Sequence, residues 1–183
     1  MTDAEDRALL ERIAKRDRLA FETFFGAHGT DVYRFVRDQV RDDGLAEELT
    51  SDVMVEVWRG AGRFAGRSRV RTWVFGIAHH KAIDALRRTR VRTIPLDELA
   101  DQPSAAAGPE TEALQAADRR QLEAALASLS AEHRAVLELT YVGGFSQKEI
   151  AEIVGCPAAT VKTRAFYAKG RLRDALGKAE LPR

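Results

Sequence analysis

The side chains best suited to chemistry cluster near the C-terminal end, on a segment whose apolar spacing is helical. Val161, Ala168 and Leu172 recur at helical intervals and form one stripe of the predicted helix. The rest of that helix presents basic, hydroxyl and aromatic groups, from Lys162, Thr163, Phe166 and Tyr167 with Arg164 on the flank. A helix fits the major groove of B-DNA, where such groups can contact base edges. The pattern therefore predicts a helix that reads duplex DNA.

The residues before this helix would position it as the second helix of a helix-turn-helix. Ser146 and Glu149 have the spacing of a capping box, which starts a short helix. Gly155 suits the tight turn, and Pro157 suits the first position of the second helix, where no N–H is needed. Cys156 falls at the N-cap, where we expect a structural role rather than redox chemistry. Together these features favour a helix-turn-helix over an ordinary helical hairpin.

A second basic segment spans residues 59–90. It holds nine Lys or Arg residues and one Asp, a net charge of +8 in a chain whose formal net charge is +1. Its candidate DNA-binding side chains, Arg63, Phe64, Arg67, Arg69, His80, Arg87 and Arg88, suit phosphates and unpaired bases. Residues 91–118 are acidic, whereas residues 119–183 are again basic. Two basic blocks on either side of an acidic stretch predict two surfaces that could bind phosphates. The alternative is that these charged blocks are simply helix faces exposed to water.

Two adjacent histidines in this segment invite a metal-site hypothesis. Neighbouring side chains on a helix point about 100° apart, so His79 and His80 form a poor metal pair. His79 falls on an apolar side and is predicted to be a core residue, whereas His80 shares a polar edge with Asp84. Trp73 is likewise predicted to belong to the core rather than to stack on bases. A metal-dependent hydrolase is therefore disfavoured, and we expect no metal.

A third cluster lies on the predicted helix that ends at Trp58. The buried face of this helix is defined by Leu45, Leu49, Val53 and Val57. Glu48, Ser51, Asp52 and Val55 lie on the opposite face. An acidic patch with an apolar centre suits a protein partner that carries basic residues, and a merely solvated face fits the same pattern.

Helical spacing runs through almost the whole chain, and no alternating run predicts a strand. Asp17 suits the N-cap of a helix that Gly29 is predicted to interrupt, and Asp31 is predicted to open the next helix. The glycine-rich stretch 60–68 is predicted to be a loop, and a long helix is expected from Val70. These patterns predict an all-α fold.

The stretch 92–117 differs in character, because it carries three prolines and little apolar surface. We expect a flexible, extended acidic linker there, although its alanines could support a short helix. Two small helical domains would then occupy residues 1–91 and 118–183.

The composition excludes several classes of protein. With 183 residues, 45% apolar and 31% charged, the chain is typical of globular proteins. One cysteine cannot form an internal disulfide, and the four histidines have no zinc-finger spacing. No apolar run is long enough to span a membrane, and the first residues lack the features of a signal peptide, so we expect a cytoplasmic protein. No phosphate-binding Gly-Lys-Ser/Thr loop occurs, and we expect no cofactor, no small-molecule substrate and no enzymatic activity.

In combination, these segments resemble a bacterial RNA polymerase sigma factor of the extracytoplasmic-function (ECF) group. The resemblance covers residues 18–176 and rests on AEELTSDVMVEVW, TWVFGIAHHKAIDALRR and the segment from LASLS to VKTR. It implies a first domain like sigma region two, which docks on the polymerase clamp and opens the minus-ten promoter element. It implies a second domain like region four, whose helix-turn-helix reads the minus-thirty-five element. Core RNA polymerase, promoter DNA and an anti-sigma factor, often membrane-anchored, are the implied partners.

The resemblance gives each cluster a role. Glu48, Ser51, Asp52 and Val55 fall where the family meets the polymerase clamp. The loop Gly62–Val70, with His80 and the Arg87-Arg88 end, falls where the family binds the minus-ten element. The family's minus-thirty-five readers correspond to Lys162, Thr163, Phe166 and Tyr167. The family usually has Arg-Asn where this chain has His79-His80, and often Arg where it has Tyr167, so these departures bear on base preference. The alternative is a stand-alone helix-turn-helix regulator, which would bind duplex DNA tightly without polymerase.

Overall fold

The computed structural model describes residues 1–92, 124–126 and 128–175, and the regular structure in these ranges is entirely helical. The elements are α1 (Asp3–Ala14), α2 (Arg18–Val40), α3 (Asp43–Gly60), the 3-10 turn η1 (Ala61–Arg63), α4 (Val70–Arg92), α6 (Ala131–Tyr141), α7 (Gln147–Val154) and α8 (Ala158–Ala175). The all-α prediction is confirmed for this part of the chain. Beyond Arg92, the predicted linker lies outside the described residues.

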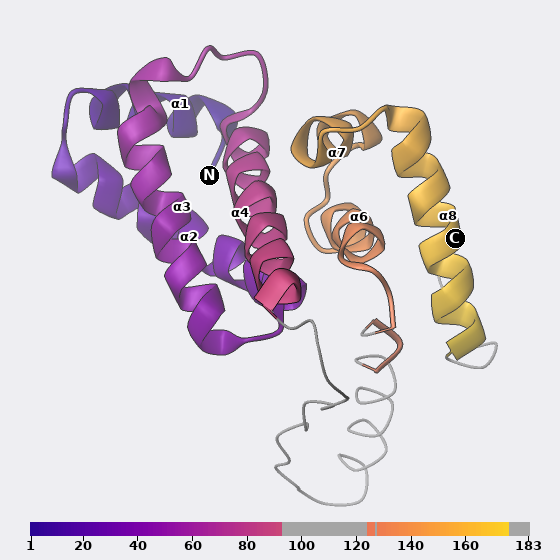
Figure 1. Ribbon diagram of the computed structural model, residues 1–183. Helices are drawn as coiled ribbons and strands as arrows, with labels where there is room; N and C mark the ends of the chain where they lie inside the picture. Colours follow the sequence, from indigo (N-terminus) through magenta and orange to yellow (C-terminus); the bar gives the residue numbers. More distant parts are fainter. Residues whose placement is uncertain (93–123, 127, 176–183) are drawn as a thin grey trace, which may run out of the picture.

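Helices α1 to α4 form a bundle in the N-terminal half (Figure 1). Asp17 caps α2 and Asp42 caps α3, each through its side-chain oxygen. The predicted stripe of Leu49, Val53 and Val57 is buried, which confirms the inward face of α3. Gly60 ends α3 and η1 follows it, so regular structure continues into the stretch that the glycines predicted to be a loop.

Helix α1 was not anticipated from the sequence. Thr2 and Glu5 form a capping box at its start, and Ile13 is fully buried in the core of the bundle. A buried contact also holds α1 in place, because Nε2 of His28 lies 2.8 Å from Oδ1 of Asp6. The Thr-x-x-Glu spacing is the signal that could have revealed this helix.

The predicted break at Gly29 is wrong, because α2 runs unbroken from Arg18 to Val40. Gly29 is buried in the helix, and a side-chain carbon added there would lie 3.1 Å from the Phe25 ring. Phe24, Val32 and Val36 continue the buried stripe across this point. Close packing, rather than a change in chain direction, therefore accounts for the glycine.

The C-terminal half is built on the predicted caps. Ser130 caps α6, and Ser146 with Glu149 forms the capping box of α7. Gly155 ends α7 with φ of +66°, the left-handed conformation that glycine adopts without strain. Helix α8 starts at Ala158, so the predicted assignment of Pro157 to the first helical position is wrong by one residue. The Pro157 carbonyl accepts the first helical hydrogen bonds, and Cys156 lies one place before the cap.

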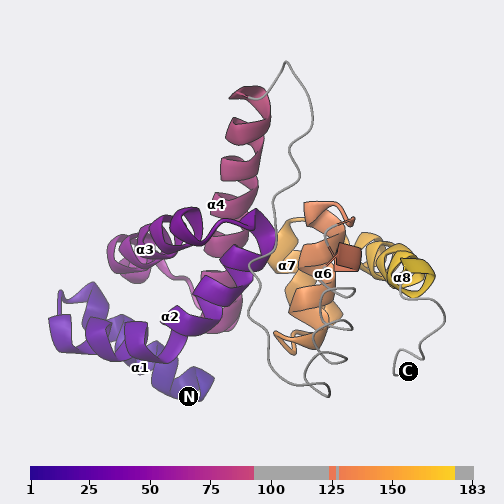
Figure 2. The same cartoon turned by 90° about the horizontal axis from the view of Figure 1, so that it is seen from below.

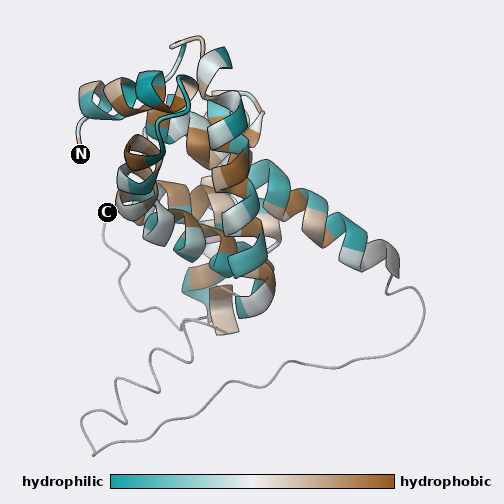
Figure 3. Ribbon diagram, turned by 90° about the vertical axis from the view of Figure 1, so that its left-hand side faces the viewer, coloured by the Kyte–Doolittle hydropathy of each residue, from teal (hydrophilic) through white to brown (hydrophobic). Residues whose placement is uncertain are grey.

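The two halves pack directly on each other. Helix α7 lies beside α4, and α6 contacts α2, as the views from two directions agree (Figures 1 and 2). Phe75 of α4 meets Phe145, just before α7, with ring centroids 5.0 Å apart. The far end of α4 projects beyond both halves and is largely hydrophilic (Figure 3). One apolar cluster therefore runs through both halves, and a second, smaller cluster in the C-terminal half contains Leu129, Leu137 and Leu172.

Candidate nucleic-acid and polymerase interfaces

The outer face of α8 carries the side chains that the sequence predicted to read DNA. Lys162 and Thr163 are exposed, and Phe166 and Tyr167 are 73% and 61% exposed with their rings in an edge-to-face pair. Val161 on the opposite side is buried. Because adjacent exposed apolar side chains often mark a binding site, the paired rings beside Lys162 and Thr163 give this face the character of a binding surface.

Arg164 differs from its neighbours. Its guanidinium lies 2.7 Å from the Glu132 carboxylate of α6 and 3.9 Å from the Cys156 sulfur. Its side chain is 24% exposed. Arg164 therefore ties α8 to α6, and it stands apart from the open face.

The segment before α4 presents a row of cations. Arg63 and Arg67 are exposed, and Phe64 is half-buried against Trp73 with ring centroids 5.2 Å apart. Arg69 reaches the other half of the protein, 3.5 Å from a Glu149 oxygen. Trp73 is partly buried: it packs against Phe64 and the core, as predicted, but it also lines an open groove beside α4. Arg87 and Arg88 are exposed on the projecting end of α4.

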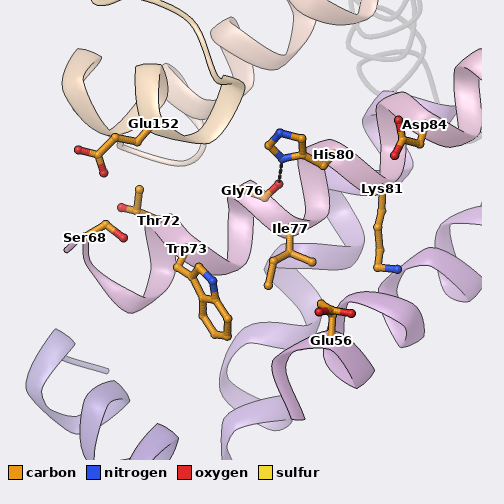
Figure 4. Close-up of a pocket in the computed structure, with 10 residues that line it drawn as sticks. All are labelled: Glu56, Ser68, Thr72, Trp73, Gly76, Ile77, His80, Lys81, Asp84 and Glu152. Carbon is orange, nitrogen blue, oxygen red and sulfur yellow. Dashed lines mark hydrogen bonds between the residues drawn. The ribbon is translucent and has the colours of Figure 1, made fainter. Parts of the chain in front are cut away.

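A groove of about 510 Å³ follows α4 between α3 and α7 (Figure 4). It is lined by Glu56, Ser68, Thr72, Trp73, Gly76, Ile77, His80, Lys81, Asp84 and Glu152. His80 lies on this surface, and its Nδ1 is 2.6 Å from the Gly76 carbonyl oxygen. Glu152 is the lining residue contributed by α7, so the groove is closed on one side by the C-terminal half.

His79 is buried, as its place on the apolar side predicted. Burial, and then the charges of His80 and Arg164, lower the pKa of His79 to about 4, so the imidazole is neutral at physiological pH. Within the described ranges, no three His, Cys, Asp or Glu side chains gather in a way that could hold a metal ion. The histidine pair thus behaves as one core residue and one surface residue.

The acidic patch on α3 is exposed as predicted. Glu48, Ser51 and Asp52 face water, and Val55 is 43% exposed among them. The Lys81 ammonium group of α4 lies 3.3 Å from the Asp52 carboxylate, and this ion pair connects one edge of the patch to α4. The arrangement leaves an apolar centre within a negative rim, which is the form expected of a protein-binding surface.

Sequence reasoning missed the residues that join the two halves. Arg71 donates a hydrogen bond to the Gly143 carbonyl at 2.6 Å and lies over the Phe75 and Phe145 rings, 5.2 Å and 4.7 Å from their centroids. No local pattern distinguishes Arg71 from the other arginines of the basic segment. Its partner lies far along the chain.

A second contact between the halves is polar and buried. Arg134 of α6 donates hydrogen bonds to the carbonyl oxygens of Asp38 and Gln39 at 2.9 Å and 3.2 Å. The Gln39 amide donates to the Glu138 carboxyl group. Burial, reinforced by a hydrogen bond and charge repulsion from Asp38, raises the pKa of Glu138 to about 9. Glu138 is therefore protonated at neutral pH in this arrangement.

Each half of the chain matches a known protein family. Residues 24–92 match the Sigma-70 region 2 family and residues 119–172 match the Sigma-70 region 4 family. The ECF RNA polymerase sigma factor SigK of Mycobacterium tuberculosis is 31% identical over 92% of this chain and 92% of its own length. This chain belongs to the ECF RNA polymerase sigma factor family.

Two solved structures share the fold of this ECF sigma factor, at 22% identity each. CnrH in complex with the cytosolic domain of CnrY covers 96% of this chain and 99% of its own, with a TM-score of 0.70. RpoE of Bartonella quintana in complex with the anti-sigma factor NepR covers 87% of this chain and 98% of its own, with a TM-score of 0.68.

As an ECF sigma factor, this protein is a transcription initiation factor that acts with RNA polymerase on promoter DNA. The stand-alone regulator is not favoured. Among the helices described, none has the length and apolar content needed to cross a bilayer.

Proposed function

We propose that this ECF sigma factor works in the cytoplasm, where it brings core RNA polymerase to a set of promoters and helps to melt them without catalysing a reaction itself. The observation that carries the proposal is the pairing of an exposed acidic patch on α3 with an exposed recognition face on α8 within one chain of the family. Binding free energy, rather than nucleotide hydrolysis, would drive melting. Residues 1–91 and 118–183 would be the two working domains, with 92–117 as their linker.

The polymerase-binding surface in this proposal is Glu48, Ser51, Asp52 and Val55. Their exposure leaves them accessible, and the carboxylates suit a partner surface that is basic. Val55 would supply the apolar contact at the centre of that surface.

The minus-ten surface in this proposal comprises Arg63, Phe64, Arg67, Arg69, His80, Arg87 and Arg88. The exposed cations suit the phosphates of a separated strand, and the edge of Phe64 suits an unpaired base. His80 is at the surface, whereas His79 is not, so His80 is the residue of the pair that can reach DNA.

The minus-thirty-five surface in this proposal comprises Lys162, Thr163, Phe166 and Tyr167. Arg164 lies beside this surface and would hold α8 in position. Lys162 and Thr163 supply donors for phosphates and base edges, and the aromatic rings suit the thymine methyl group. The ion pair with Glu132 would make Arg164 a positioning residue.

An anti-sigma factor is the third partner that we propose. The structures of CnrH and RpoE were solved with CnrY and NepR bound, which supports regulation of the same kind here. Such a partner would compete with polymerase for this chain.

In vitro transcription tests the proposal. The purified chain, mixed with core RNA polymerase and genomic fragments, should yield transcripts from a small set of start sites, and core polymerase alone should not. Tight, sequence-specific duplex binding by the chain alone, with no transcripts in the presence of core polymerase, would instead establish the stand-alone regulator.

A further inference from the structure

The loop between η1 and α4, residues 64–69, carries side chains of the proposed minus-ten surface but has little structure of its own. It contains no regular helix or strand. Within the described part of the chain, the N–H groups of residues 65–69 donate no hydrogen bond to a backbone oxygen. A cavity of about 550 Å³ lies between this loop and α1, lined by Leu10, Ala14 and Phe64 among others. The shape of the loop therefore depends on contacts made from outside it.

Arg7 of α1 supplies contacts along the whole length of the loop. Its Nη2 donates a hydrogen bond to the Ser68 carbonyl oxygen at 2.8 Å, and its guanidinium carbon lies 5.5 Å from the centroid of the Phe64 ring. Between these two points, Gly66 has a φ of +67°, and a side-chain carbon added there would lie 2.8 Å from Nη1 of Arg7. The guanidinium thus lies against the start, the middle and the end of the loop.

Asp3, also on α1, fixes the end of the loop where α4 begins. Its Oδ1 accepts a hydrogen bond from the backbone N–H of Val70 at 2.8 Å, and its Oδ2 accepts one from Nε of Arg7 at 2.8 Å. Arg69 precedes α4 and has no side-chain acceptor, so the carboxylate of Asp3 caps the helix instead. Although burial opposes it, hydrogen bonds from Arg7 and Val70 lower the pKa of Asp3, so the group is ionised at neutral pH.

Helix α1 is itself fixed to the N-terminal bundle. Leu10 and Ile13 are buried in the core, and the buried contact between Asp6 and His28 joins α1 to α2. The two polar side chains that hold the loop therefore project from a firmly anchored helix.

We propose that Asp3 and Arg7 are positioning residues for the minus-ten site, which hold loop 64–69 in the conformation in which it distinguishes one base from another. The proposal rests on the proposed function of this loop. Both residues lie before the range 24–92 that matches the Sigma-70 region 2 family. A loop that is ordered before DNA arrives loses less conformational entropy on binding, so a loosened loop binds its preferred bases less selectively.

The opposite charges of the two residues separate positioning from direct attraction to phosphates. Attraction alone predicts tighter DNA binding for D3A, which removes a negative charge, and weaker binding for R7A. Positioning predicts that both variants lose base selectivity. R7K keeps the charge, but an ammonium group lacks the planar fork that reaches Asp3 and Ser68 together, so R7K should behave like R7A.

The experiment uses the full-length chain with core RNA polymerase and a pool of promoter duplexes. The pool is one responsive genomic fragment whose minus-ten positions are randomised, and each template carries a transcribed barcode. The transcript yields give the ratio between the best and the worst base at each position. R7A, R7K and D3A should each lower this ratio by about fivefold or more at one or more positions. In a second pool, randomised at the minus-thirty-five element, the ratios should match those of the parent.

This ratio does not depend on how much of the holoenzyme is active, so a variant that is only less stable would leave it unchanged. The matched controls are E22A and R18A, which remove exposed charges of the same two signs from α2 and should keep the parental ratios. Circular dichroism and co-elution with polymerase check folding and assembly. If R7A and D3A do not fold, R7K decides the matter as the mildest change. Parental ratios for D3A and R7A, or for R7K, would overturn the positioning role.

The parent chain separates this outcome from a failure of the proposed function. If the parent selects bases at the randomised minus-ten positions and the variants select them equally well, only the role of Asp3 and Arg7 is wrong. If the parent yields no transcripts, or selects no base at these positions, the assignment of the minus-ten loop fails, and the positioning role fails with it.

Discussion

The carboxyl group of Glu138 in α6 accepts a hydrogen bond from the side-chain amide of Gln39 in α2, across the boundary between the two halves. This carboxyl is protonated at neutral pH, because its pKa is raised from 4.5 to about 9 by burial and by the neighbouring Asp38. In a form with the halves apart, water would reach Glu138 and its pKa would return toward the ordinary value. Between these two pKa values, the packed arrangement would therefore bind one more proton than such a form.

The packed arrangement of the two halves should lose stability as pH rises from about 4.5 to about 9, because a form with the halves apart would release the Glu138 proton in that window. E138Q keeps a neutral hydrogen-bonding group and should flatten this dependence. The largest dimension from small-angle scattering, measured from pH 6 to pH 9, checks both curves. E22Q is the control and should follow the parent; an E138Q curve as steep as the parent's would contradict the role of this proton.

D52R should abolish binding to core polymerase while the chain stays folded. The substitution reverses a charge on the rim of the acidic patch, and juxtaposed like charges at an interface should lower affinity by about a hundredfold or more. The Asp52 side chain is exposed, so its ion pair with Lys81 contributes little to folding. Co-elution with core polymerase and circular dichroism are the measurements. E22R, with the same reversal on α2, should bind normally, and retained binding by D52R would remove Asp52 from the interface.

K162A should weaken binding of the holoenzyme to promoter duplex and reduce the salt slope by about 1, because one phosphate contact is lost. R164A is the internal contrast. Because the Arg164 guanidinium is paired with Glu132, its loss should lower thermal stability and change the salt slope less. Affinity titrations at several salt concentrations, with melting curves, distinguish the two variants. An unchanged slope for K162A would place Lys162 outside the contact.

D6A should destabilise the N-terminal bundle by about 1–3 kcal/mol, because it leaves His28 buried without its hydrogen-bond partner. Both side chains are almost fully buried, so water cannot replace the contact. D6N retains a hydrogen-bond acceptor for His28, so it should lower the free energy of unfolding by less than D6A does. Chemical denaturation measures both variants, and equal losses for D6A and D6N would indicate that the charge, rather than the hydrogen bond, holds α1.

Local chemistry made much of this fold predictable. The capping box of Ser146 and Glu149, the turn at Gly155 and the stripe of Leu49 and Val53 depend on neighbours within a few positions, and each is present as predicted. The prediction of a break at Gly29 fails because a glycine within a helical pattern can mark either a helix end or close packing, and the position of the Phe25 ring, which spacing does not reveal, decides between them.

The contacts between the halves could not be found in the same way. Arg71 and Arg134 look like surface cations in sequence, yet one bonds Gly143 and the other bonds the carbonyls at the end of α2. Arg69 and Arg164 fit a DNA-binding pattern, but each is paired with a glutamate that lies far from it in the chain. Such pairings follow from tertiary packing, which spacing along the chain does not encode.

Helix α4 joins the aromatic cluster around Trp73 rigidly to the arginines on its projecting end. With a rise of about 1.5 Å per residue, Trp73 and Arg88 are held about 22 Å apart along the axis. Adding a single residue between them would swing the arginines about 100° around that axis, away from any strand that follows the helix. The continuous helix α4 thus fixes both the distance and the angle between Trp73 and Arg88, so an insertion or deletion between them would displace one group relative to the other.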